Sequence, residues 1–98
     1  MRRPRDRSLP RPVTMHWGQG AVIEEASAVG EYHEPAIQLI RFEDGSRSLR
    51  FCYYSLDGRF QRSPLMLNEG EMEGLRAALD RWPELRDLLG RLVGYQTG

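Results

Sequence analysis

Cysteine and long apolar runs are both scarce in this chain. The single cysteine, Cys52, excludes an internal disulfide, and its position within a β-type run favours a buried, inert thiol. No apolar run approaches the roughly 20 residues that span a bilayer, and the N-terminus lacks the apolar segment of a secretory signal. The sequence therefore predicts a cytoplasmic protein with no part in a membrane.

Lysine is absent, because all fourteen basic side chains are arginine. Fourteen Asp and Glu balance them unevenly: residues 1–14 hold five arginines against Asp6 (+4), and the remainder holds nine against thirteen acids (−4). A basic tail on a mildly acidic domain argues against nucleic-acid binding through bulk charge. A local cluster of arginines is still able to bind it.

Motifs for catalysis or metal binding are missing as well. His16 and His33 have no carboxylate or cysteine at a recurring ligand spacing. Gly18-Gln19-Gly20 lacks both the spacing of a phosphate-binding loop and a following helix. We therefore expect neither an enzyme nor a metal or cofactor site. A ligand-binding role would need a deep pocket that gathers Tyr32, His33 or Cys52.

Composition divides the chain into a domain and two tails. Residues 1–15 are rich in proline and arginine and have little to bury, so we expect a disordered basic tail. Whether the protein starts at Met1 or Met15 is left open. Residues 16–94 are long enough for a single domain, and residues 95–98 form a short C-terminal tail.

The domain alternates β-type runs with turn signals. Asp44-Gly45 and Asp57-Gly58 are strong hairpin signals, because these residues tolerate the positive φ of primed turns. We predict an α+β fold whose sheet is a four-stranded antiparallel meander. Proline at position 64 indicates an edge or a bulge in the last strand. The expected strands are Gly20–Val29, Ala36–Glu43, Ser48–Leu56 and Arg59–Leu67.

An amphipathic helical tract follows the last strand. Asn68 is a good N-cap, and Glu71 stands where a capping box has its acid. Pro83 interrupts the apolar stripe, which predicts either one kinked helix over Glu69–Leu92 or two helices broken at Trp82-Pro83. We expect this tract to cover one face of the sheet. Leu49, Phe51 and Tyr53 would then face the helix, and Arg50, Cys52 and Tyr54 would face outward.

Arginines and aromatic residues recur along the predicted strands. Arginines can bind successive phosphates while exposed rings stack on bases, and many proteins bind single-stranded nucleic acid in this way. The alternative is a solvated outer face with ordinary salt bridges. The candidate nucleic-acid-binding residues are Arg41, Arg47, Arg50, Tyr54, Arg59, Phe60 and Arg62.

The leucine stripe continues for two to three turns beyond Pro83, further than a short sheet can cover. Surplus apolar surface of this kind often marks an interface with a partner. We therefore predict a homodimer formed through the helical tract. The alternative is that the second half folds back and completes its own core. The candidate interface residues are Leu79, Trp82, Leu85, Leu88, Leu89 and Leu92.

The order of elements and the segment SLRFCYYSLDGRFQRSPLMLNEGEMEGL (residues 48–75) resemble the positive-cofactor-four family of single-stranded-DNA-binding transcriptional coactivators. Leu65 and Leu67 match the isoleucine and leucine of the family's strand motif, and Asn68 matches its helix cap. Met72 and Leu75 match the aromatic residue and the leucine of its helix. The resemblance implies a dimer made through the helices and a curved sheet that grips single strands.

Two functions follow from these observations. The first is a small non-enzymatic protein that binds single-stranded DNA or RNA, with a role like that of a transcriptional regulator. The alternative is a protein–protein interaction module that uses the leucine-rich C-terminal helix. If nucleic acid is the ligand, the candidate arginines must converge on one open face. If a protein is the partner, the largest exposed patch must be apolar and centred on the leucines.

Overall fold

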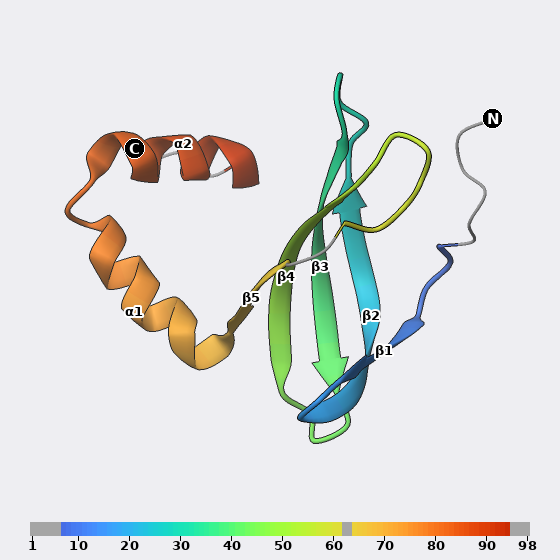
Figure 1. Cartoon of the computed structure of the whole chain (residues 1–98). Helices are drawn as coiled ribbons and strands as arrows, with labels where there is room; N and C mark the ends of the chain where they lie inside the picture. The colour runs from blue at the N-terminus through green and yellow to red at the C-terminus, as the bar shows by residue number, and fades with distance from the viewer. Residues whose placement is uncertain (1–6, 62–63, 95–98) are drawn as a thin grey trace.

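The computed structural model describes residues 7–61 and 64–94. An antiparallel sheet with the strand order β1-β2-β3-β4-β5 is followed by two helices (Figure 1). The α+β class and the meander are confirmed, but the sheet has five strands rather than four. The elements are β1 (Arg11–Met15), β2 (Gly18–Ser27), β3 (Glu34–Phe42), β4 (Arg47–Tyr54), β5 (Leu65–Asn68), α1 (Glu69–Leu79) and α2 (Pro83–Val93).

The additional strand, β1, lies within residues 1–15, where we expected a disordered tail. It pairs with β2 through a two-residue turn, with Met15 opposite Gly18 and Arg11 opposite Val22. Val13 packs on the core, so this short run does have a side chain to bury. Pro12 is tolerated because β1 is an edge strand, where a missing N–H breaks no ladder.

Both predicted Asp-Gly turns contain a glycine with positive φ. Gly45 has a φ of 89° between β3 and β4, and Gly58 has a φ of 94° in the loop after β4. The run after this loop is less regular than predicted. Over Arg59–Leu67, Phe60 forms an isolated bridge with Tyr54, and a regular strand begins at Leu65. Pro64 precedes that strand, in keeping with its inability to donate to a ladder.

The sheet is strongly curled around its core. Val22, Ile40 and Phe42 form the buried centre. Side chains from both edge strands, Val13 on β1 and Met66 on β5, pack against this same cluster. The two edges therefore bend toward each other over one face, which we call the inner face. The opposite side of the sheet is the outer face.

The inner face carries the residues of β4 that we expected to point outward. Tyr54 is only 4% exposed, and the register aligns Arg50 with Gln38 of the inner face. Phe51 and Tyr53 lie on the outer face, where Tyr53 is 45% exposed. The expectation was wrong because it took the helices, rather than the curl of the sheet itself, as the cover of the core.

The helical tract consists of two helices, so of the two alternatives the single kinked helix is wrong. Asn68 caps α1: its side chain accepts the Glu71 N–H, and the Glu71 carboxylate accepts the Asn68 N–H. Pro83 is the first residue of α2, where its missing N–H breaks no helical hydrogen bond. The break therefore falls where the proline predicted it.

The two helices, together the helical arm (Glu69–Val93), do not cover the sheet as expected. They extend from β5 to one side of it (Figure 1), and no residue of either helix is buried. The radius of gyration is 15.1 Å, against about 13 Å for a compact chain of this length. No helix in the described part of the chain is long and apolar enough to cross a membrane.

Candidate functional site

One end of the inner face holds a network of polar side chains. The Glu25 carboxylate accepts hydrogen bonds from the Tyr54 hydroxyl and the Gln38 amide, both at 2.7 Å. Arg11 contacts the same carboxylate at 3.4 Å, and Arg50 donates to the Gln38 carbonyl oxygen at 2.6 Å. Gln38 is completely buried. Burial of these groups is compatible with stability because each is hydrogen-bonded.

The network lowers the pKa of Glu25 and raises the pKa of Tyr54. Burial disfavours the Glu25 carboxylate, but hydrogen bonds from Tyr54 and Gln38 and the charge of Arg11 outweigh this effect and lower its pKa. Burial and the hydrogen bond to the Glu25 carboxylate raise the pKa of Tyr54. At neutral pH the pair is therefore a carboxylate that accepts from a phenol.

Three of the candidate nucleic-acid-binding residues meet at this network. Arg50 lies over the ring of Phe60, 4.7 Å from its centroid, and Phe60 packs edge-to-face on Tyr54 with centroids 5.7 Å apart. Tyr54 is buried and hydrogen-bonded, so its ring faces the interior. Phe60 is 38% exposed, so its ring is the more open of the two.

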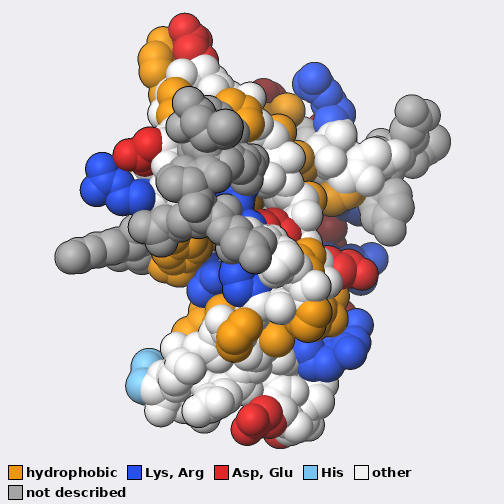
Figure 2. Space-filling view, turned by 90° about the vertical axis from the view of Figure 1, so that its right-hand side faces the viewer, with side chains coloured by type: hydrophobic (Ala, Val, Ile, Leu, Met, Phe, Trp, Pro, Cys, Tyr) orange, Lys and Arg blue, Asp and Glu red, His pale blue; other side chains and the backbone are white. Residues whose placement is uncertain are grey.

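The other candidate arginines lie elsewhere. Arg41 and Arg47 are neighbours on the outer face, and Arg47 forms a 2.9 Å ion pair with Glu69. Arg59 is in the loop after β4, paired with Asp57 at 3.3 Å. Arg62 lies outside the described residues. In Figure 2 the arginine side chains form separate groups with acidic side chains between them. The structure thus divides these arginines between two faces and a loop.

The candidate interface residues, by contrast, share one arm. Trp82 and Leu88 are each 59% exposed, and Leu92 is 61% exposed. Leu85, Leu88, Leu89 and Leu92 line a common hollow on α2. Leu79, at the end of α1, is the partly buried member of the set. The predicted stripe is therefore present and open to solvent.

The outer face of the sheet carries a second apolar surface, part of which is exposed among the described residues. Ile37 and Phe51 face each other across β3 and β4, and Leu65 beside them is 58% exposed. A groove of about 660 Å³ runs along this surface, and Leu92 from α2 closes one side of it. Sequence reasoning missed this surface because it placed the helical arm over it.

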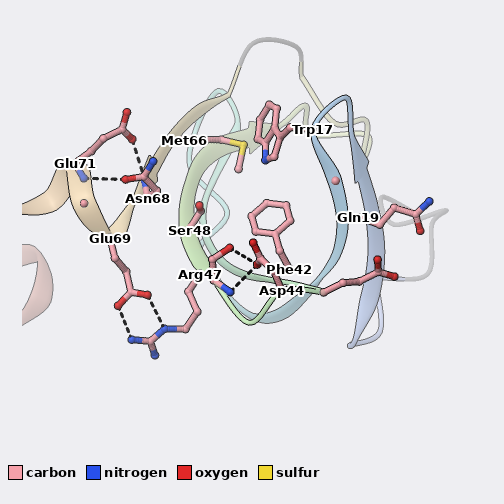
Figure 3. A pocket seen from close by; sticks show the side chains of 14 residues that line it. Trp17, Gln19, Phe42, Asp44, Arg47, Ser48, Met66, Asn68, Glu69 and Glu71 are labelled. Carbon is pink, nitrogen blue, oxygen red and sulfur yellow. Dashed lines mark hydrogen bonds and ion pairs between the residues drawn. The ribbon is translucent and has the colours of Figure 1, made fainter.

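A further pocket, which sequence reasoning also missed, opens at one end of the curled sheet (Figure 3). We call it the mouth; it has a volume of about 700 Å³ and is lined by residues 17–19, 42–44, 46–48, 66 and 68–71. Three side chains point into it: Trp17 from the turn between β1 and β2, Phe42 from β3 and Met66 from β5. The sequence signal for this pocket was Trp17, in the two-residue turn between β1 and β2. It was missed because residues 1–15 were not expected to form a strand, so no turn was predicted there.

Polar groups surround this aromatic floor. Asp44 accepts the Ser46 N–H at 2.9 Å and its hydroxyl at 2.6 Å, and these bonds lower the pKa of Asp44. The ion pair with Arg47 likewise lowers the pKa of Glu69. Both carboxylates are therefore ionised at neutral pH. Glu43 is exposed at the same rim.

The chain matches no protein-family model, no curated protein and no solved structure.

Proposed function

We propose that this protein is an assembly module that forms a homodimer through its helical arm. The observation that carries the proposal is the open leucine stripe of α2, in which Leu88 is 59% and Leu92 61% exposed. A contiguous exposed apolar patch of this kind usually marks an interface, because leaving it in water forgoes its hydrophobic stabilisation. The stripe at spacing i, i+3, i+4 and i+7 is the pattern by which helices pack together.

The outer face of the sheet supports a second copy as the partner. Each chain carries two apolar surfaces, the stripe and the outer face, and among the described residues of its own arm Leu92 is the one that lines the groove. In a twofold dimer each copy would offer its arm to the other copy and receive that copy's arm in return. Both surfaces would then be covered by one symmetric contact.

The test is the mass of the full chain in solution, by sedimentation velocity over a range of concentrations. We expect a concentration-dependent dimer. Leu88→Glu should weaken it by at least about tenfold, or ~1.4 kcal/mol, because a carboxylate would enter an apolar contact. Val29→Glu is the matched control, since Val29 is 53% exposed in the loop after β2. A monomer at every concentration, or a dimer unaffected by Leu88→Glu, would contradict the proposal.

Single-stranded nucleic-acid binding stays a prediction, and the coactivator resemblance with it. Its candidate residues are divided between the two faces, and Arg47 and Arg59 are already paired with acids. Titration of fluorescent oligo-dT and a matched duplex by anisotropy tests it directly. Salt-sensitive binding of the single strand that Arg50→Glu removes would support this function, whereas no binding at low salt would exclude it.

A further inference from the structure

The mouth combines an aromatic floor with an excess of negative charge. Trp17 is 59% exposed and its indole is tilted over Phe42, with ring centroids 6.3 Å apart. His16 packs edge-on against the indole at 4.6 Å and so restricts its position. An exposed tryptophan at the edge of a pocket, held by a neighbouring ring, presents its π-face to whatever enters. Such faces attract cations more strongly than neutral groups.

The charges favour the same sign of ligand. Among the described residues that line the mouth, Glu43, Asp44, Glu69 and Glu71 are acidic and Arg47 is basic. Arg47 is already paired with Glu69, so three carboxylates are left without a basic partner in that lining. The electrostatic potential inside the mouth is therefore negative, and the low-dielectric walls of the pocket strengthen it.

The N-terminus of α1 also lines the mouth, and a free helix N-terminus would favour an anion. Here it is already occupied by the chain's own groups. The Asn68 side chain accepts the Glu71 N–H at 2.8 Å, and the Glu71 carboxylate accepts the Asn68 N–H at 3.0 Å. Glu69 and Glu71 stand in the first turn and offset the positive end of the helix dipole. An anion would meet these carboxylates first.

Ser48 adds a hydroxyl to the wall of the mouth. It is 7% exposed and stands on the wall of the mouth (Figure 3). Within the described part of the chain its hydroxyl makes no hydrogen bond. Because this hydroxyl borders the open space of the mouth, it can hydrogen-bond to a polar group or to water there.

We propose that the mouth binds an alkylammonium group, held against the exposed face of Trp17 beside Phe42 and neutralised by the surrounding carboxylates. The volume of about 700 Å³ suits a small organic cation or the end of a lysine side chain. The aromatic pair would contact the alkyl groups on nitrogen, and Glu43 and Asp44 would supply the counter-charge. The mouth includes the first turn of α1 but none of the leucines of α2, and the proposal does not depend on self-association.

The experiment uses the full chain with Trp82→Phe, which leaves Trp17 as its single tryptophan. Its fluorescence is followed while choline, or an acetylated trimethyllysine amide, is added. A parallel titration uses 3,3-dimethylbutanol, which has the shape of choline without its charge. We expect saturable binding of a cation and none of the neutral alcohol. Tighter binding of choline would indicate a small metabolite, and tighter binding of the lysine derivative a protein side chain.

Two substitutions test the site itself, with binding followed by calorimetry because one of them removes the fluorophore. Trp17→Leu should weaken cation binding by at least about tenfold, since the aromatic contact is lost. Glu43→Gln should weaken it less and reduce its salt dependence. Glu31→Gln, an exposed residue in the loop before β3, is the matched control and should change nothing. Equal binding of the neutral alcohol, no saturation with either cation, or unchanged affinity in Trp17→Leu would overturn the proposal.

Discussion

At the scale of single residues, the carboxylate of Glu25 holds the inner face together. It accepts hydrogen bonds from Tyr54 and Gln38 and lies within 3.4 Å of Arg11. The β-bulge between Val22 and Glu24 sets the register that aligns Glu25 with Gln38 across β2 and β3. A one-residue change of register would turn this carboxylate to the outer face.

Glu25 gives the stability of the protein a defined acid dependence. Its pKa is lower in the folded chain, so its contribution is present above the unfolded value of about 4.3 and is lost as pH falls through the folded pKa. Glu25→Gln should lower the free energy of unfolding at pH 7 by about 1–3 kcal/mol. Urea unfolding from pH 7 to pH 3 should show that difference shrinking. A difference independent of pH would contradict this role.

Gly20 is required by close contact between β2 and β3. A Cβ at this position would lie 2.4 Å from the Arg41 carbonyl oxygen, a backbone atom that cannot swing aside. Gly20→Ala should therefore destabilise the fold by about 1–3 kcal/mol. Gly18→Ala is the control in the same strand, because nothing lies within 4 Å of its Cβ position. Equal melting temperatures for the two variants would show that the strands adjust freely.

At the scale of elements, the junction between β5 and α1 sets the direction of the helical arm. Asn68 is both the last residue of β5 and the cap of α1, so there is no linker between them. The Arg47–Glu69 ion pair ties the first turn of the helix to β4. The capping box and this ion pair therefore hold the first turn of α1 at the end of β5.

Removing the cap should loosen that junction. Asn68→Ala deletes the oxygen that accepts the Glu71 N–H, which typically costs about 1 kcal/mol. The expected result is a lower midpoint in urea and weaker helical circular dichroism. Asn68→Asp keeps an oxygen at the same place and should behave like the wild type. If both variants unfold alike, the cap does not hold the arm.

At the scale of the whole molecule, the described residues leave apolar side chains exposed on both the sheet and the helical arm. The core consists of a few residues on the inner face, whereas Tyr53 and Leu65 on the outer face and the leucines of α2 are exposed. A domain of this size has a small free energy of unfolding. Covering these surfaces with a second copy would add hydrophobic burial that the single chain lacks.

Dimerisation should therefore be visible in the thermal stability. The melting temperature is expected to rise with protein concentration, because a partner that binds the folded state stabilises it by mass action. Leu88→Glu should remove that dependence and lower the melting temperature at high concentration. Differential scanning calorimetry over a hundredfold range of concentration measures both. A melting temperature independent of concentration in the wild type would contradict the dimer.

The sequence by itself determined the features that depend on near neighbours. The glycines at 45 and 58, the Asn68 cap and the start of α2 at Pro83 all follow from the backbone preferences of a few adjacent residues. The leucine stripe of α2 likewise follows from helical periodicity. These parts of the fold were predictable.

The tertiary structure alone decided which face of the sheet is inside. Alternation on β4 separates Arg50 and Tyr54 from Phe51, but it cannot say which set is buried when both contain aromatic residues. That choice depends on the curl that brings Val13 and Met66 onto one cluster, a contact between strands far apart in sequence. The same curl builds the mouth from Trp17 and Phe42 and divides the arginines between two faces. Local patterns fix the elements, whereas long-range packing fixes what they enclose.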